Sequence, residues 1–199
     1  MTLYILFGHP QESSASDSVQ SFTADLCTAF MDSAHEAGHT IVYKNLYDMV
    51  RNGLWSSELT ADDLSQRFRG GMTDDIAREQ AELLRSDVLV MFHPVWWWSV
   101  PAIVKGWCDR TLQYGFAFEK GKGLLTHLKS VVIQTAGNSK EFHDEKQIHD
   151  IIERPLREGT LEFCGIHTRH FETIFSTTSL SAEDRHTILE SVRRLAHNL

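Results

Sequence analysis

Continuous apolar runs alternate along the chain with stretches whose apolar positions recur every three or four residues. The first run, residues 3–7, contains no polar residue and predicts a strand that is covered on both faces. Phe22, Leu26 and Phe30 then keep helical spacing up to Gly38, a residue type that favours the end of a helix. This alternation predicts successive βαβ units and therefore a parallel sheet.

The same alternation continues to the end of the chain. Further strands are expected at residues 40–43, 88–92, 130–134 and 168–173. Helices are expected at about 60–68, 73–85, 101–113 and 148–158, and from Ser181 onward. Residues 1–199 should thus form one α/β domain, a doubly wound five-stranded parallel sheet with helices on both faces. Ligands of such sheets bind beyond the carboxyl ends of the strands.

Residues 47–73 break this regularity. Two breaker triplets, Arg51-Asn52-Gly53 and Arg69-Gly70-Gly71, lie on either side of the short helix expected near residues 60–68. Because long connections in compact domains often carry function, this segment is a second place to look for a site.

Charge and cysteine content narrow the class of protein. With 19 basic and 27 acidic residues the net charge is −8, which argues against a nucleic-acid partner and an anionic membrane surface. Cys27, Cys108 and Cys164 lie in apolar settings without a CxxC motif, so we expect reduced core residues. The first apolar run is too short for a signal peptide or a membrane span, and we expect a cytoplasmic protein.

Three adjacent tryptophans follow the third expected strand. Neighbouring residues of a regular element point apart, so Trp96, Trp97 and Trp98 cannot share one buried face. Flat aromatic walls suit a planar conjugated ligand. The alternative is that the tryptophans serve the core and a contact between two copies of the chain.

Two other loops follow expected strands. In the first, His9, Ser14 and Ser16 face the amino end of a helix, which favours an anion site, although an ordinary helix cap explains them equally well. The loop has neither the P-loop spacing nor G-x-G-x-x-G. In the second, Ala136 and Gly137 would let the backbone approach a ligand closely.

Several of these motifs occur together in one family. They are His9-Pro10 with its serine loop, Pro94-Val95-Trp96-Trp97, the segment 101–107, Gly115-Phe116-Ala117-Phe118, Thr135-Ala136-Gly137 and the segment 161–165, in order over nearly the whole chain. By them the chain resembles the NAD(P)H quinone dehydrogenase family, which has a flavodoxin-like fold. The family includes DT-diaphorase, the modulator of drug activity B and ancillary oxidoreductases of potassium-efflux systems.

The resemblance implies a function and a cofactor. The function would be a flavin-dependent NAD(P)H:quinone oxidoreductase that moves two electrons from NAD(P)H to a quinone by ping-pong kinetics. FAD is the expected cofactor, with FMN possible, and a homodimer carries the flavin sites at its interface. A regulatory subunit of a potassium-efflux membrane protein and a one-electron flavodoxin carrier are the alternatives.

The resemblance also implies roles for individual residues. The tryptophan segment would lie along the flavin ring, the second loop at its pyrimidine edge, and the first loop at its phosphate and ribityl groups. Arg185 would lie near the adenine end, Phe116 and Phe118 would line the substrate pocket, and His149 would face the reactive side as the catalytic residue. Phe142 stands where the family often has a tyrosine. The expected cofactor contacts are His9, Ser14, Ser16, Pro94, Val95, Trp96, Trp97, Trp98, Thr135, Ala136, Gly137, Phe142 and Arg185.

A metal is a weaker interpretation of the histidine-rich stretch. His143 and His149 are six residues apart, which does not place them on one helix face. No HExxH motif or carboxylate-rich loop accompanies them. We therefore expect no metal site.

Overall fold

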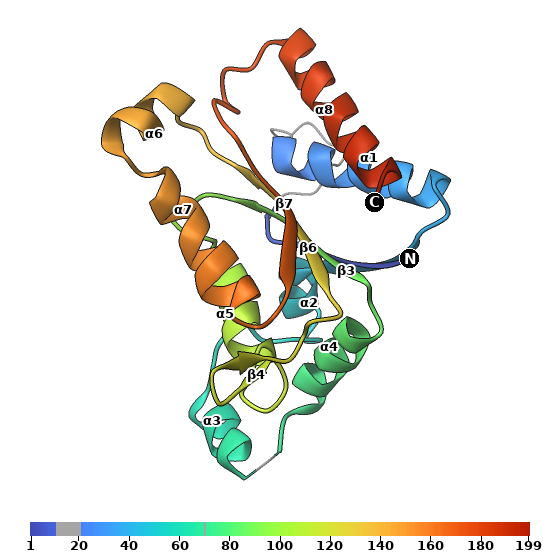
Figure 1. Cartoon of the computed structure of the whole chain (residues 1–199), viewed down its shortest axis with the longest axis vertical. Coiled ribbons are helices and arrows are strands. Elements are labelled where there is room, and N and C mark those ends of the chain that lie inside the picture. The colour runs from blue at the N-terminus through green and yellow to red at the C-terminus, as the bar shows by residue number, and fades with distance from the viewer. Residues whose placement is uncertain (11–20, 70) are drawn as a thin grey trace.

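Five parallel strands form the centre of the computed structural model, which describes residues 1–10, 21–69 and 71–199 (Figure 1). The strands are β1 (Thr2–Phe7), β2 (Thr40–Asn45), β3 (Val88–Pro94), β6 (Lys129–Thr135) and β7 (His167–Ile174). Their order is β2-β1-β3-β6-β7, so the order reverses between β1 and β3. The predicted fold class is confirmed, and a switch in strand order of this kind marks where ligands bind.

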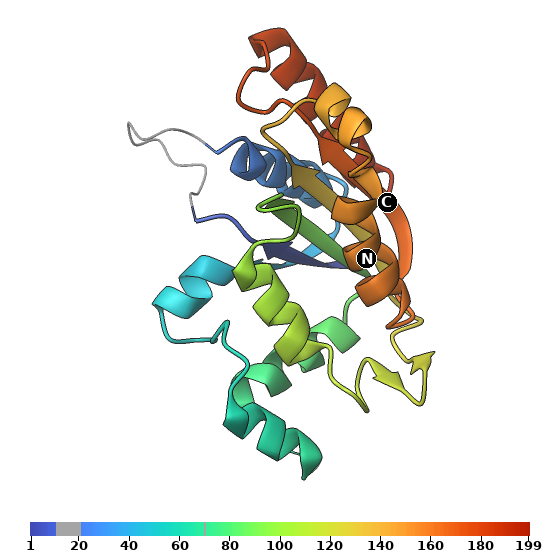
Figure 2. The same ribbon diagram turned by 90° about the vertical axis from the view of Figure 1, so that its left-hand side faces the viewer.

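Helices cover both faces of the sheet (Figures 1 and 2). On one face lie α1 (Phe22–Glu36) and α8 (Ala182–His197). The other face is covered by α2 (Leu46–Arg51), α4 (Asp74–Leu84), α5 (Ala102–Thr111) and α7 (His149–Leu156). The remaining elements are α3 (Ala61–Phe68), a hairpin of β4 (Phe118–Glu119) and β5 (Lys122–Gly123), α6 (Lys140–Lys146) and a π-helical segment (Arg157–Glu162).

The apolar runs form strands because both of their faces are buried. In β1, Leu3, Ile5 and Phe7 pack beneath α1 and α8. Tyr4 and Leu6 point to the opposite layer. Burial of each such side chain contributes about 1.5–3 kcal/mol, so a polar substitution on either face would be costly.

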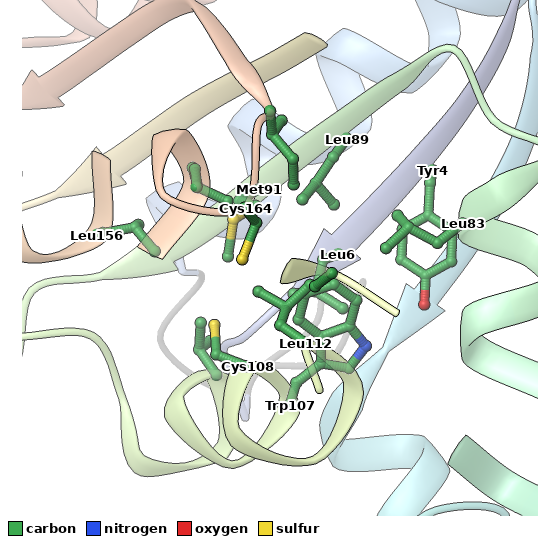
Figure 3. Close-up of a cluster of buried hydrophobic side chains, with 14 of the residues drawn as sticks. Tyr4, Leu6, Leu83, Leu89, Met91, Trp107, Cys108, Leu112, Leu156 and Cys164 are labelled. Atoms are coloured by element: carbon green, nitrogen blue, oxygen red, sulfur yellow. The ribbon is translucent and has the colours of Figure 1, made fainter. Parts of the chain in front are cut away.

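Trp107 lies at the centre of the second layer (Figure 3). It is fully buried against Tyr4 and Leu83, and its indole donates a 3.0 Å hydrogen bond to Glu79. Its neighbour Gly106 must be glycine, because a Cβ there would lie 2.0 Å from the Ser57 carbonyl oxygen. This tryptophan therefore belongs to the core, unlike Trp96, Trp97 and Trp98, which are exposed.

The irregular segment 47–73 is held against α5 by Arg110. This buried guanidinium donates to both oxygens of Asp63 at 3.1 Å and to Asp75 at 2.6 Å. It also donates to the Ser56 carbonyl at 2.8 Å. The expected helix near residue 60 exists as α3, capped by Thr60. The segment thus has a clear structural role.

Three short elements were not predicted: α2, α6 and the β4–β5 hairpin. Asn45 caps α2 and Ser139 caps α6, each by accepting backbone N–H groups of the first turn. The prediction for the cysteines is confirmed, because all three are buried and free. Across the described residues, no helix has the length and apolar character needed to cross a membrane.

Candidate functional site

A pocket of about 310 Å³ opens at the carboxyl ends of β3 and β6. Its walls come from the loop after β3, the loop after β6, and α6. It is lined by Val95, Trp97, Trp98, Ala136, Gly137, Asn138 and His143. Five of the seven were predicted as site residues, and they reach one pocket because parallel strands end at the same edge of a sheet.

The aromatic wall is built on a strained two-residue turn. Trp96 and Ser99 exchange backbone hydrogen bonds of 2.9 and 3.1 Å, and the turn between them holds Trp97 at φ 49° and Trp98 at φ 59°. Positive φ costs a residue with a Cβ about 1–2 kcal/mol. The turn holds Trp97 with 96% of its surface exposed. Strain and exposure of this kind are typical of functional sites.

Trp98 begins a chain of aromatic contacts along the pocket. Its indole stacks on Phe142 with a centroid distance of 6.0 Å and an angle of 13°. It meets the edge of His143 at 5.5 Å. His143 in turn contacts Phe175, just after β7, at 4.8 Å. Neither His143 nor Phe175 was predicted as a site residue.

The loop after β6 forms the small-residue wall. Thr135 lies beneath it, buried, with its hydroxyl 2.7 Å from that of Thr23. The Ala136 N–H donates to the Ile174 carbonyl at 2.8 Å, and the Ala136 carbonyl accepts from Thr177 at 3.1 Å. These bonds fix the loop, and the small side chains of Ala136 and Gly137 leave room for a flat ligand.

Among the described residues, Asn138 and His143 line the pocket with polar side chains, and His143 carries the ionisable one. It is only 1% exposed, and among the described residues its Nδ1 has no hydrogen-bond partner. Burial, and secondarily the neighbouring His149, lower the pKa of His143 below its usual value. An imidazole in the wall of a pocket can exchange hydrogen bonds with a ligand that carries polar atoms.

His149, the predicted catalytic residue, lies behind His143. The two rings are 5.7 Å apart, and His149 does not line the pocket itself. Its Nε2 is 2.5 Å from Asp144 Oδ1. Gln147, at φ 54°, ends α6 and so separates it from α7. This break brings together two histidines that a single helix would have separated.

The other predicted cofactor contacts are distributed around this centre. His9 is half-buried, 6.1 Å from the Trp96 ring, while Ser14 and Ser16 lie outside the described residues. Pro94 is buried at the end of β3. Arg185 donates to the Thr177 carbonyl at 3.0 Å, and its guanidinium lies 4.8 Å from the centre of the Phe22 ring. Because Thr177 donates to the Ala136 carbonyl, Arg185 is connected to the loop after β6 through Thr177.

Phe116 and Phe118, predicted for the substrate pocket, are not brought to it within one chain. Phe116 packs against the second core layer. Phe118 begins β4 and packs on Phe163 at 5.1 Å and Tyr114 at 5.9 Å. In Figure 1 this hairpin and α6 lie at opposite ends of the layer.

The donor set suits a flat organic ring better than a metal ion. Indole faces, small apolar residues, one amide and one imidazole surround the pocket. Within the part of the chain that the structure describes, no three histidine, cysteine or acidic side chains converge on a possible metal position. The residues present therefore fit a flavin ring.

Comparisons with known proteins agree with this geometry. The family model described as flavodoxin-like fold matches residues 1–199. A Haemophilus influenzae protein named as an uncharacterized NAD(P)H oxidoreductase is 30% identical over 176 residues, 86% of this chain and 82% of that protein. The rat NAD(P)H dehydrogenase [quinone] 1 is 27% identical over 194 residues, 87% of this chain and 71% of that one.

A solved structure extends the likeness to three dimensions. The NAD(P)H:quinone oxidoreductase from Methanothermobacter marburgensis superposes with a TM-score of 0.83 at 29% identity, covering 100% of this chain and 96% of that one. With the family model matching from end to end, the chain belongs to the flavodoxin-like fold family, alongside NAD(P)H quinone dehydrogenases.

Proposed function

We propose that the protein is a flavin-dependent oxidoreductase that takes a hydride from NAD(P)H and delivers two electrons to a quinone. The observation that carries this proposal is the pocket itself, where Trp97, Trp98 and His143 converge with the small-residue loop. Whole-chain likeness to proteins named as NAD(P)H:quinone oxidoreductases supports it. A bound flavin would supply the redox chemistry, because it accepts a hydride and returns two electrons.

The chain's own residues would bind and orient the flavin. Trp97 and Trp98 offer flat faces to its ring, and Ala136 and Gly137 let the backbone approach the ring edge. Together with Ser14 and Ser16, His9 would bind the phosphate and ribityl groups. We take FAD as the cofactor because Arg185 matches the family's arginine near the adenine end, and FMN remains the alternative.

His149 would hold or donate a proton near the acceptor. Its contact with Asp144 fixes one ring nitrogen. Histidine exchanges protons near neutral pH, which suits protonation of a quinone oxygen. Because His149 lies behind His143, it would act through that ring or through water.

A homodimer would complete the site. Trp97 is 96% exposed, and exposed aromatic residues next to a pocket are typical of contact surfaces. A second copy could also place Phe116 and Phe118 over the pocket, which one chain does not do. Light scattering at micromolar concentration tests this, and a monomer there would contradict it.

Steady-state kinetics test the proposed reaction. The substrates are NADH or NADPH and a water-soluble benzoquinone. If both use one pocket in turn, double-reciprocal plots of rate against substrate concentration should give parallel lines. Intersecting lines would contradict the shared pocket, and no turnover by the flavin-loaded protein would overturn the proposed activity. Protein stripped of flavin is the control and should be inactive.

A further inference from the structure

Three rings enclose the imidazole of His143 and restrict the protonation states that it can adopt. Trp98 and Phe175 contact its ring at 5.5 and 4.8 Å, and His149 lies 5.7 Å away. Its Nδ1 is buried and, among the described residues, has no acceptor or donor beside it. The ring nevertheless lines the pocket.

The enclosure favours one tautomer. A proton on Nδ1 would leave a buried N–H without an acceptor, and such orphaned N–H groups are rarer than unpaired acceptors. A charged imidazolium would carry that N–H and a desolvated charge as well. The neutral ring with a bare Nδ1 and a proton on Nε2 avoids both costs, and the lowered pKa of His143 agrees with it.

We propose that His143 is a hydrogen-bond donor of the pocket: a neutral imidazole whose Nε2–H binds the polar edge of the flat ring ligand. That the ligand is a flavin rests on the proposed function. Phe142 next to it has no polar group and stacks on Trp98 instead. The donor at this wall is therefore His143, a residue to which sequence patterns gave no such role.

The groups around His143 hold the ring in place. His149 from α7 pairs with Asp144 from α6, and Asp144 also accepts a 2.8 Å bond from Lys140. The loop after β3 and the end of β7 contribute only the rings of Trp98 and Phe175 to this contact. A donor fixed in advance loses little entropy when it binds a ligand.

The tautomer can be measured without any ligand. Imidazole ¹⁵N shifts of the apoprotein at pH 7.5 identify which nitrogen of each histidine carries a proton, and His143→Gln identifies the His143 signals by their loss. We expect a proton on Nε2 alone. A proton on Nδ1, or on both nitrogens, would overturn the proposal.

Affinity for FMN and FAD tests the donor itself. His143→Gln keeps an N–H donor near the position of Nε2, whereas His143→Phe keeps only the ring. We expect His143→Phe to weaken flavin binding about tenfold and His143→Gln to weaken it less than threefold, roughly the loss of one hydrogen bond. The exposed His127→Phe is the matched control and should bind as wild type.

The outcomes separate this proposal from the proposed function. Wild-type flavin affinity in a folded His143→Phe variant would overturn the donor role, with thermal unfolding used to check the fold. If the wild type bound neither FMN nor FAD, the proposed function would fall. The ¹⁵N measurement on the apoprotein would then still decide the tautomer of His143.

Discussion

Two turns in this molecule have positive φ at both central residues but differ in the residue types that occupy them. Between β4 and β5, Lys120 and Gly121 have φ of 49° and 75° and join a paired hairpin. After β3, Trp97 and Trp98 have φ of 49° and 59° and are flanked by a bridge between Trp96 and Ser99. Tight hairpin turns with two positive φ values favour glycine and asparagine.

The hairpin turn follows that preference and the tryptophan turn violates it. At the hairpin, glycine removes the strain at one of the two positions. At the pocket, both positions keep large side chains in a costly conformation. Strain persists where a surrounding structure holds it, and it clusters at ligand sites. The difference supports the proposal that the tryptophan turn serves binding, and we expect the stability of the fold to be determined elsewhere.

If so, the largest loss of stability should come from Arg110, which belongs to neither turn. Arg110→Leu leaves the buried Asp63 and the half-buried Asp75 without their cation. We expect the free energy of unfolding at pH 7 to fall by about 3–5 kcal/mol. Urea unfolding measures it, with the exposed Arg193→Leu as control, expected within about 1 kcal/mol of wild type. A loss below about 1 kcal/mol for Arg110→Leu would show that the cluster does not stabilise the fold.

The same cluster should make stability depend on acid. Burial raises the pKa of Asp75, but hydrogen bonds from Arg110 and Thr73 outweigh it and lower the value to about 2. Because the folded pKa lies below the unfolded value of about 3.9, this contribution is complete above pH 4 and is lost as the pH falls towards 2. We expect roughly 2 kcal/mol of the difference between wild type and Asp75→Asn to vanish over that range. An unchanged difference would contradict this account.

At the pocket, substitutions should change chemistry and binding instead. His149→Ala should lower turnover by roughly tenfold to a hundredfold, since it removes a proton-exchanging group. Phe142→Tyr should change turnover little or raise it. Stopped-flow measurement of flavin reduction and quinone reduction checks both variants, with the exposed His167→Ala as control. Wild-type rates of both half-reactions in His149→Ala would refute its role.

Trp98→Leu should weaken flavin binding by roughly tenfold while leaving the fold intact. The substitution removes an indole face that stacks on Phe142 and lines the pocket. Stacking between aromatic rings contributes about 1 kcal/mol beyond buried area. Fluorescence titration with FMN and FAD measures the change. An unaltered dissociation constant would remove Trp98 from the proposed wall.

The smallest expected effect comes from matched glycine substitutions in the two turns. Glycine relieves positive φ, so Trp97→Gly and Lys120→Gly should each raise the free energy of unfolding by up to about 1 kcal/mol. Only Trp97→Gly should also weaken flavin binding. Equal affinities for the two variants would mean that the strain at Trp97 has no connection with the ligand.

The sequence predicted the sheet well because burial on both faces leaves a strong pattern. The runs that became β1 and β3 contain almost no polar residue, and few structures other than buried parallel strands have that composition. Short elements escaped because packing forms them: α6 has seven residues, six of them polar or charged, and begins at the cap Ser139. The hairpin of β4 and β5 has two residues in each strand.

The sequence predicted the pocket residues that lie in loops after strands, but not the residue on α6 that tertiary contacts bring to the pocket. Trp97, Trp98, Ala136 and Gly137 follow strands directly, so the position of the strand locates them. His143 could not be found in this way, because it lies on α6 and its surroundings come from other elements, the rings of Trp98 and Phe175. The six-residue spacing of His143 and His149 argues against a shared face only within one helix, and α6 ends at Gln147 between them.

The central claim is that the pocket after β3 and β6 holds a flavin that NAD(P)H reduces and a quinone reoxidises. The most direct measurement is the visible absorption of the purified protein, recorded anaerobically after adding NAD(P)H and then a benzoquinone, with the released cofactor identified by mass. We predict a yellow protein that releases FAD or FMN, bleaches with NAD(P)H and recovers its colour with the quinone. A colourless protein that takes up neither flavin would contradict the account.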